Sequence, residues 1–356
     1  MVGYPSWGHL REEDGGDMRS ILITGCASGI GYDAALALSQ RGWRVFATCR
    51  TAEACAQLEA AGLERFDEST IEAAVAETLD RTGGTLDAVF NNGAYAIPGL
   101  VEDLPRDALR ACFEANLFGP IDLANRLMPP FVAQGHGRIV QCSSVLGFGP
   151  ARVRGAYVGT KHALEGMTDC LRLELAGQPI HVSLIEPGPI PTRFRINSQT
   201  QFARWIDVEG SRNREFYEDV VKPRLYDESG TPDRFELPAA AVTAKLIHAL
   251  EAPRPRARYY VTTATWIASA VKRLLPTRLS DAVFVRICAA PFATGAPRAT
   301  CRSCRMTLSS GLSSPPALWC SASSSSALAD SPAVASSTRN TRIRSCACAS
   351  RPSLSR

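Results

Sequence analysis

The stretch Thr24-Gly25-Cys26-Ala27-Ser28-Gly29-Ile30-Gly31 decides the fold, because it joins a short apolar run, Ile21 to Ile23, to a segment with helical period. Gly25 permits a tight turn, Gly29 lets a phosphate approach the backbone, and Gly31 lets the new helix pack closely on the sheet. An ordinary glycine-rich turn is the alternative. The order of strand, turn and helix favours a bound nucleotide, whose pyrophosphate would meet the free N–H groups at the helix N-terminus.

Apolar runs of strand length alternate with helix-period segments through most of the chain. The expected strands cover residues 21–24, 44–48, 86–91, 138–142, 180–185 and 258–261. The expected helices lie near residues 29–41, 52–61, 69–81, 106–134, 155–176 and 237–251. This alternation predicts right-handed βαβ units, and therefore an α/β fold with a doubly wound parallel sheet, the Rossmann fold. The third strand, between Leu63 and Ile71, is the weakest prediction because that segment is short and polar.

A phenol and an ammonium group, those of Tyr157 and Lys161, stand four residues apart in one of the expected helices. Residues at i and i+4 share a helix face, so we expect the Lys161 charge to lower the pKa of Tyr157 toward a working pH. A tyrosine with such a pKa can act as a general acid or base. A solvated helix also carries such pairs by chance, so the pair gains meaning only from the motifs around it.

In the order of its motifs the chain resembles the short-chain dehydrogenase/reductase family. The motifs are TGCASGIG, Asn91-Asn92-Gly93-Ala94, Asn116, Ser144, Tyr157-Val-Gly-Thr-Lys161 and Pro187-Gly188-Pro189-Ile190-Pro191-Thr192. The resemblance runs from about residue 20 to about residue 285. Two further segments, SLIEPGPIPTRF and RYYVTTATWIASAVKRLLP, are most similar to bacterial oxidoreductases of the branch that also holds hydroxysteroid and retinol dehydrogenases.

The resemblance implies hydride transfer between a nicotinamide and a carbonyl or alcohol carbon. Tyr157 would protonate the carbonyl oxygen during reduction, and Ser144 would hold that oxygen by a hydrogen bond. Lys161 would lower the pKa of Tyr157 and bind the nicotinamide ribose. Asn116 matches the position that anchors a proton-relay water. We choose Ser144 over Ser143 because it stands thirteen residues before Tyr157, the spacing that the resemblance suggests.

The residues after the second strand favour NADP over NAD. An NAD enzyme of this fold carries an acid there to bind the ribose 2′-hydroxyl, but this chain has Cys49 followed by Arg50. The guanidinium can bind a 2′-phosphate, although a solvated arginine is the alternative. Asp67 is the expected neighbour of the adenine. The cofactor contacts that we expect are Gly25, Ser28, Gly29, Ile30, Gly31, Arg50, Asp67, Asn92, Gly93, Tyr157, Lys161, Pro187, Gly188, Ile190 and Thr192.

We expect one domain, residues 18–287, with an extension at each end. Residues 1–17 are polar and rich in glycine, and Met18 is our hypothesis for the natural start. Residues 288–356 are dominated by Ser, Ala, Arg, Pro and Cys without a period, which predicts a disordered tail or out-of-frame sequence.

Two segments of the domain invite a functional interpretation. Residues 193–235 follow a strand end and are the natural substrate lid, with a variable surface helix pair as the alternative. Their aromatic residues would line a lid over an apolar substrate or form its own packing core: Phe194, Phe202, Trp205, Phe216 and Tyr217. Residues 264–287 predict one or two amphipathic helices, which would cover the core, form a subunit contact or lie on a membrane surface.

Charge and hydropathy exclude several classes of protein. The formal net charge is +4, but residues 288–356 hold eight Arg against the single acid Asp330, so the rest is slightly negative and gives no argument for nucleic acid. No apolar run is long enough for a transmembrane segment, and the N-terminus lacks a signal-peptide core. We therefore expect a cytoplasmic protein.

The twelve cysteines divide equally between residues 1–287 and residues 288–356. Those of the first group lie singly in an α/β enzyme that looks cytosolic, so we expect reduced thiols and no disulfide framework. Cys301 and Cys304 have the spacing of half a zinc site, but nothing nearby completes four ligands, so we expect no metal.

The leading hypothesis is an NADP-dependent reductase or dehydrogenase acting on aldehydes or on retinoid-like or steroid-like carbonyls. The rival is a noncatalytic NADP-sensing protein of the same fold, which we would expect to lose the tyrosine or the lysine. A third hypothesis, a damaged gene product that folds poorly, rests on the short third-strand region and the tail. The resemblance further suggests a homodimer or homotetramer formed through the long helices near 106–134 and 155–176.

Overall fold

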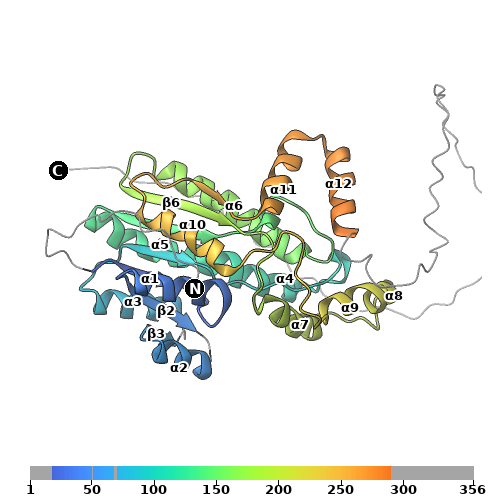
Figure 1. Cartoon of the computed structure of the whole chain (residues 1–356), viewed down its shortest axis with the longest axis horizontal. Helices are drawn as coiled ribbons and strands as arrows, with labels where there is room; N and C mark the ends of the chain where they lie inside the picture. The colour runs from blue at the N-terminus through green and yellow to red at the C-terminus, as the bar shows by residue number, and fades with distance from the viewer. Residues whose placement is uncertain (1–17, 50, 68–69, 290–356) are drawn as a thin grey trace, which may run out of the picture. The chain divides into compact units, whose positions relative to one another are not determined.

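Seven parallel strands form the central sheet of the part of the chain that the structure describes, in the order β3-β2-β1-β4-β5-β6-β7. This computed structural model describes residues 18–49, 51–67 and 70–289. The strands are β1 (Ser20–Ile23), β2 (Arg44–Cys49), β3 (Glu64–Asp67), β4 (Ala88–Asn91), β5 (Gly137–Cys142), β6 (Ile180–Glu186) and β7 (Arg258–Tyr260). The doubly wound parallel sheet of a Rossmann fold is thereby confirmed (Figure 1).

Helices follow the strands in the alternation that the sequence predicts. In the first half they are α1 (Gly29–Gln40), α2 (Ala52–Ala60), α3 (Ile71–Arg81), η1 (Val101–Asp103), α4 (Arg106–Phe113), η2 (Glu114–Phe118), α5 (Gly119–Gln134) and η3 (Val145–Gly147). In the second half they are α6 (Gly155–Glu174), α7 (Phe194–Trp205), α8 (Arg214–Phe216), η4 (Tyr217–Val221), α9 (Lys222–Leu225), α10 (Ala239–Glu251), α11 (Thr263–Leu274) and α12 (Thr277–Ala289).

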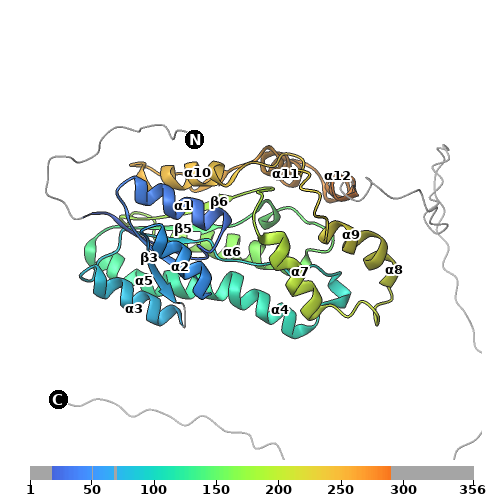
Figure 2. The ribbon, with the colours of Figure 1, turned by 60° about the horizontal axis from the view of Figure 1, so that its bottom comes forward.

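Two layers of helices cover the two faces of the sheet. Figure 2 shows α1 and α10 on one face and α3 and α5 on the other. Successive residues of a strand point to opposite faces, so Ile21 and Ile23 pack under α1 and α10 while Leu22 packs with α5. All three are fully buried, and burying such a side chain stabilises a fold by about 1.5–3 kcal/mol.

The sheet reverses its direction of winding beside β1. The chain builds outward through β2 to β3 and then returns to place β4 on the other side of β1. In an open parallel sheet, ligands bind outside the carboxyl ends of the strands at this switch point. The glycine turn after β1 and the Asn91-Asn92-Gly93-Ala94 motif after β4 therefore meet where the fold places a ligand.

The third strand forms despite its polar sequence. β3 pairs with β2 over four residues, and Cys49 at the end of β2 lies opposite Asp67 at the end of β3. Arg44 of β2 supports the edge through an ion pair with Glu64, whose Nε and Oε1 atoms are 2.6 Å apart. β3 thus forms the edge strand of the sheet, although its segment is short and polar.

The expectation of reduced cysteines is wrong for one pair, because Cys49 and Cys55 form a disulfide. The Cα atoms of the pair are 5.8 Å apart, within the range that a disulfide can bridge. Cys49 ends β2 and Cys55 lies in the first turn of α2, which brings two cysteines six residues apart together. Sequence spacing alone did not reveal this turn.

The long helix expected over residues 106–134 is interrupted. A π-helical segment, η2, separates α4 from α5 and contains Asn116. Pro120 follows within the first turn of α5, and it has no N–H to donate to the Asn116 carbonyl four residues before it. The interruption therefore sits at a residue that the sequence marks as functional, as single π-turns often do.

The expected lid, residues 193–235, contains α7, α8, η4 and α9. Phe202 and Tyr217 are buried in a small core that this segment shares with α4 and α6. The Tyr217 hydroxyl donates to Asp103 Oδ2 at 2.8 Å and accepts from the Leu100 backbone N–H at 2.8 Å. These two aromatic residues therefore pack the segment onto α4 and α6, while the ring of Phe194 reaches Tyr157.

Residues 264–287, expected to be helical, lie in α11 and α12, and α12 continues to Ala289, two residues past the expected domain boundary. Residues 1–17 and those from 290 onward, which include the Cys301 and Cys304 pair and nearly all of the expected tail, lie outside the described residues. Within the described ranges, no helix has the length and apolar character needed to cross a bilayer.

Candidate active site

The three glycines of the turn between β1 and α1 have no room for a β-carbon. Gly25 has a φ of +73°, and a β-carbon there would lie 2.8 Å from Gly93 Cα. A β-carbon on Gly31 would overlap the Gly25 carbonyl oxygen. The turn is therefore shaped by close approach of backbone to backbone, which only glycine permits.

The N-terminus of α1 has the features of an anion site. Ser28 is the N-cap residue, yet its side chain makes no capping hydrogen bond, and the first turn holds no acidic residue. Ile30 packs against the core beneath the turn. The first-turn N–H groups and the helix dipole therefore fit a bound pyrophosphate.

The loop after β4 is tied to the glycine turn by Thr24, a residue that our sequence analysis did not single out. The backbone N–H groups of Asn92 and Gly93 each donate to Thr24 Oγ1 at 3.0 Å. The Asn92 side chain donates to the carbonyl oxygens of Thr24 and Gly25 at 3.0 and 3.2 Å. A threonine at a strand end, just before the first glycine, is the signal that could have revealed this role.

The segment from Pro187 to Thr192 leaves β6 and lies against the other motifs. The Pro187 carbonyl accepts from the Val145 N–H at 2.8 Å, which joins it to the loop after β5. A β-carbon on Gly188 would overlap Thr262, which ends the loop before α11. Ile190 packs on the core of the β1 and α1 side. The structure thus gathers the expected nicotinamide turn and the glycine turn at one edge of the sheet.

Tyr157 lies in the first turn of α6 and faces the end of β5. Its side chain is only 8% exposed, and it lies close enough to the Ser144 side chain for that hydroxyl to act on its pKa. The ring of Phe194, from α7, meets the Tyr157 ring edge-on with 5.4 Å between the ring centres. Ser143 instead lies beside Gly147. Of the two adjacent serines, Ser144 is the one that the structure brings to Tyr157.

The expected lowering of the Tyr157 pKa is not found. Burial raises the pKa of Tyr157 well above its usual value, and nearby Cys142 adds to the rise, while the hydrogen bond with Ser144 opposes it. Lys161 donates from Nζ to the Cys142 carbonyl at 2.7 Å, and its ammonium lies 5.6 Å from the centre of the Tyr157 ring. Burial also lowers the pKa of Lys161. The phenol is therefore neutral and able to donate a proton.

Asn116 is fully buried, and its side chain is occupied by protein partners. Its Oδ1 accepts from the Tyr95 N–H at 3.0 Å, and its Nδ2 donates to the Tyr95 carbonyl at 2.8 Å and to Thr160 Oγ1 at 3.2 Å. Thr160 stands immediately before Lys161 on α6. Asn116 thus joins the loop after β4 to the helix that carries Tyr157.

Arg154 is a second residue near the site that the sequence analysis missed. It is the N-cap residue of α6, and its charge acts to lower the pKa of Tyr157, though less strongly than burial raises it. Burial and the charges of Arg224 and Arg195 lower the pKa of Arg154 itself. Its position three residues before Tyr157 is the only sequence signal.

The adenine side of the expected site is described in part. Arg50 lies outside the described residues, and for Asp67 the structure gives the backbone position beside Cys49. The Gly25 N–H donates to Thr48 Oγ1 at 3.3 Å, so the end of β2 contacts the glycine turn. In the described part of the chain, no group of three or more His, Cys, Asp or Glu side chains is placed to hold a metal ion.

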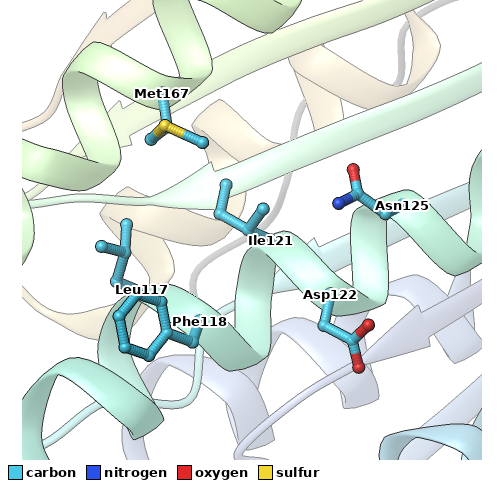
Figure 3. Close-up of a pocket in the computed structure, with 6 residues that line it drawn as sticks. All are labelled: Leu117, Phe118, Ile121, Asp122, Asn125 and Met167. Carbon is cyan, nitrogen blue, oxygen red and sulfur yellow. The ribbon is translucent and has the colours of Figure 1, made fainter. Parts of the chain in front are cut away.

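A separate hollow of about 270 Å³ lies between α6 on one side and η2 and α5 on the other. Figure 3 shows Met167 of α6 on one side and the side chains of η2 and α5 on the other. Its lining is largely apolar: Leu117, Phe118, Ile121, Asp122, Asn125 and Met167. Phe118 is 53% exposed and Met167 48%. Neither Tyr157 nor Ser144 lines this hollow.

Comparison with known proteins defines the class. The family model described as short chain dehydrogenase matches residues 19–202. An uncharacterized oxidoreductase, YbbO of Escherichia coli (strain K12), is 36% identical over 271 residues, which cover 74% of this chain and 93% of that protein. The chain belongs to the short-chain dehydrogenase/reductase family and is an oxidoreductase of the NAD(P)-binding Rossmann type.

Two further proteins extend the comparison. The NADPH-dependent 3-dehydrocapnine reductase of Ornithobacterium rhinotracheale is 29% identical over 286 residues, which cover 76% of this chain and 97% of that protein. The crystal structure of a short-chain dehydrogenase from Streptomyces avermitilis has a TM-score of 0.59 and 26% identity, and it covers 76% of this chain and 96% of that one.

Proposed function

We propose that the chain is an NADP-dependent oxidoreductase that transfers a hydride between NADP(H) and a carbonyl or alcohol substrate, with Tyr157 as the general acid or base. The observation that carries the proposal is the placement of buried Tyr157 beside the Ser144 side chain at the end of β5. Lys161 lies on the same helix face, one turn further on. Together these side chains can hold and protonate a carbonyl oxygen.

The cofactor, when bound, supplies or accepts the hydride. Its pyrophosphate would lie over Gly25, Gly29 and Gly31 at the N-terminus of α1. The nicotinamide end would lie along Pro187, Gly188, Ile190 and Thr192. This arrangement follows from the contact of the two segments at the sheet edge.

In the reducing direction, Tyr157 gives its proton to the substrate oxygen while Ser144 Oγ holds that oxygen. Because burial keeps Tyr157 neutral, the residue is in the form that donates. Lys161 then supports the phenolate that forms, because an ammonium nearby favours the charged state. Ser144 Oγ already accepts from the Leu146 N–H at 3.1 Å, which fixes its position for the substrate.

Asn116 is a positioning residue in this proposal. Its side chain is held by Tyr95 and Thr160, so a proton-relay water would bind its main-chain carbonyl instead. Pro120 leaves that carbonyl without the usual helical donor. A water there would connect the Lys161 region to solvent and return a proton to Tyr157.

The preference for NADP is supported by the absence of an acid at the end of β2. Cys49 stands where an NAD enzyme needs a carboxylate, and its sulfur is bonded to Cys55. One related protein is named an NADPH-dependent reductase. Replacing Arg50 by Asp should therefore shift the cofactor preference toward NAD. An unchanged ratio of the two dissociation constants would mean that another residue binds the 2′-phosphate.

We propose an apolar carbonyl substrate, such as an aldehyde, a retinoid or a ketosteroid. Phe194 from α7 packs edge-on against the Tyr157 ring and would give the substrate an aromatic wall. The core under α7 and η4 keeps this wall in place, because Phe202 and Tyr217 are buried within it. An apolar wall next to the hydroxyls of Tyr157 and Ser144 suits an apolar substrate that presents a single carbonyl to these two hydroxyls.

The deciding experiment is titration of the purified full chain with NADPH and, separately, NADH. A panel of medium-chain aldehydes, retinal and ketosteroids is then followed by cofactor absorbance. Tighter binding of NADPH with turnover supports the proposal. Tight binding without turnover of any panel member favours the rival, a noncatalytic NADP-sensing protein.

We further propose that the chain forms a homodimer or homotetramer through α5 and α6. The hollow lined by Phe118, Ile121 and Met167 leaves apolar side chains partly exposed on these two helices. Exposed apolar surface that borders a hollow is typical of an interaction site. The partner that we propose is a second copy of the chain.

A further inference from the structure

The helical hairpin of α11 and α12 ends in an exposed turn that combines apolar and basic side chains. We call residues 272–279 the hairpin tip: Lys272, Arg273, Leu274, Leu275, Pro276, Thr277, Arg278 and Leu279. All eight residues are exposed, and Leu274 and Leu279 are 78% and 57% exposed. Figure 1 shows the hairpin, in orange, standing away from the sheet with this turn at its far end.

The base of the hairpin is firmly attached. Thr262 caps α11 by accepting from the Thr265 N–H. Ser269 donates to the Tyr260 hydroxyl at 2.9 Å, and the rings of Tyr260 and Trp266 pack with 4.7 Å between their centres. Phe284 of α12 is 7% exposed. The exposure of the hairpin tip is therefore a feature of an ordered element, with its own packed base.

The same base contacts the candidate active site. Thr262 lies against Gly188, and the Phe284 ring lies beside Gly149 in the loop that follows Ser144. The base of the hairpin thus contacts the two loops that flank the proposed substrate position.

The charge of the hairpin tip has one sign. Lys272, Arg273 and Arg278 are the basic residues, and the sequence has no acid between Ala252 and Ser280. Among the described residues, none of the three forms a salt bridge. The hairpin tip therefore presents positive charges and exposed leucines together.

The positive charge of the hairpin tip decides which partner it can bind. A second copy of the hairpin tip would bring like charges together. Residues 288–356 of the same chain carry eight Arg against one Asp, so they offer no complementary charge. An anionic lipid surface satisfies both features, because its headgroups attract Lys and Arg while its acyl region takes the leucines.

We propose that the hairpin tip binds the surface of a bilayer that contains anionic lipids. The leucines enter the boundary between headgroups and acyl chains, and the three basic side chains remain among the phosphates. If the proposed function holds, this attachment places the site close to a bilayer in which an apolar substrate dissolves. The binding itself does not depend on the proposed activity.

Co-sedimentation of the full chain with vesicles tests the proposal. The vesicles are phosphatidylcholine alone and an equal mixture of phosphatidylcholine and phosphatidylglycerol. Each basic residue near an anionic surface raises partitioning by about fivefold. The double variant Lys272→Gln/Arg273→Gln should therefore lower binding to the mixed vesicles about tenfold or more. Leu274→Asn/Leu279→Asn should lower it by about tenfold, because apolar burial in the interface is lost.

Matched variants separate the hairpin tip from other surfaces. Arg106→Gln/Arg110→Gln removes the same charge from exposed positions of α4, and Val132→Asn/Leu173→Asn changes apolar residues that are 57% and 71% exposed. These controls should bind like the unaltered chain. If the control and tip variants lose vesicle binding equally, or if neither loses it, the proposal is overturned. Any vesicle binding then belongs to another part of the chain.

Two other results would also overturn it. Equal binding to both kinds of vesicle would remove the role of charge. A change in sedimentation size of the leucine variant without vesicles would show that a second copy covers the hairpin tip. Circular dichroism and thermal melting of each variant check that the fold is retained, and NADPH titration shows whether the proposed cofactor site is intact independently of vesicle binding.

Discussion

Gly29 of the glycine turn and Thr192 after β6 lie in direct contact, although they are far apart in the sequence. A β-carbon on Gly29 would lie 2.7 Å from Thr192 Cγ2, and Gly29 has a φ of +61°. The contact closes the edge of the sheet where the proposed pyrophosphate and nicotinamide positions meet. Any side chain at residue 29 must therefore move Thr192, the turn or both.

The first prediction concerns this contact. Gly29→Ala should weaken NADPH binding about tenfold or more, because the new methyl group displaces Thr192 and fills the space that a phosphate needs. Gly42→Ala is the matched control, since Gly42 has a φ of +79° but open space around it. Both variants should lose about 1 kcal/mol of stability through backbone strain. If the two variants bind NADPH equally, the space at Gly29 has no part in cofactor binding.

Tyr157→Phe tests the proposed general acid. The variant keeps the ring that packs against Phe194, so NADPH should bind with an unchanged dissociation constant. Turnover should fall by about 10²–10⁴-fold, the usual contribution of general acid–base catalysis. Steady-state kinetics and a separate binding titration measure the two effects. Activity retained near the original level would assign the proton to another group.

Glu186 predicts a pH dependence of stability. Its side chain is fully buried at the end of β6, and burial together with the nearby Glu165 raises its pKa to about 8, against the opposing effect of Arg258. The unfolded chain has the ordinary pKa, so between about pH 4.5 and 8 the folded state binds more protons. The contribution of Glu186 to the free energy of unfolding is therefore present at low pH and is lost as the pH rises toward 8.

Glu186→Gln removes this titration while Oε1 can still accept from Arg258 Nη1, a bond of 2.6 Å in the structure. The melting temperature of the unaltered chain should fall more between pH 5 and pH 8 than that of the variant, with a difference in stability of roughly a few kcal/mol. Thermal melting across this range measures both curves. Parallel curves would mean that Glu186 is ionised in the folded state and that Arg258 outweighs burial.

The alternation of strands and helices could be predicted from the sequence because the helices have a hydrophobic period and the buried strands are short apolar runs. Ile21, Leu22 and Ile23 show why, since a central strand is buried on both faces and stays apolar throughout. The roles of the glycines could also be predicted, because a position where two backbone segments approach closely leaves no room for a side chain. The glycine turn, Asn92, Ser144 and Pro187 are brought together because they follow the ends of neighbouring parallel strands, and α6 adds Tyr157 and Lys161.

Other features depend on contacts that no local pattern encodes. The tie between Thr24 and Asn92 joins residues that follow two different strands, and the Asn116 side chain bonds the backbone of Tyr95, which lies in another loop. The sequence placed Lys161 beside Tyr157 but could not show that its ammonium bonds the Cys142 carbonyl. Pairing Cys49 with Cys55 required the turn into α2.

The disulfide gives a prediction about stability. Its loop is short, so the loss of chain entropy on closing it is modest, and Cys55→Ser should lower the stability by about 2 kcal/mol. A reductant such as dithiothreitol should lower the melting temperature of the unaltered chain to about that of Cys55→Ser. It should leave the melting temperature of Cys55→Ser unchanged. Cys170→Ser, at an exposed free cysteine, is the control. A reductant effect that persists in Cys55→Ser would point to a different bond.

The hollow between α5 and α6 gives the last prediction. Phe118→Glu places a charge at a half-exposed apolar position of the lining, and burying a charge at a subunit contact without a partner is costly. The variant should therefore shift the full chain toward monomer in analytical ultracentrifugation. Val132→Glu adds the same charge to α5 at a residue that is 57% exposed and does not line the hollow. That control should keep the original assembly; if it dissociates as readily, general repulsion and not the hollow sets the oligomeric state.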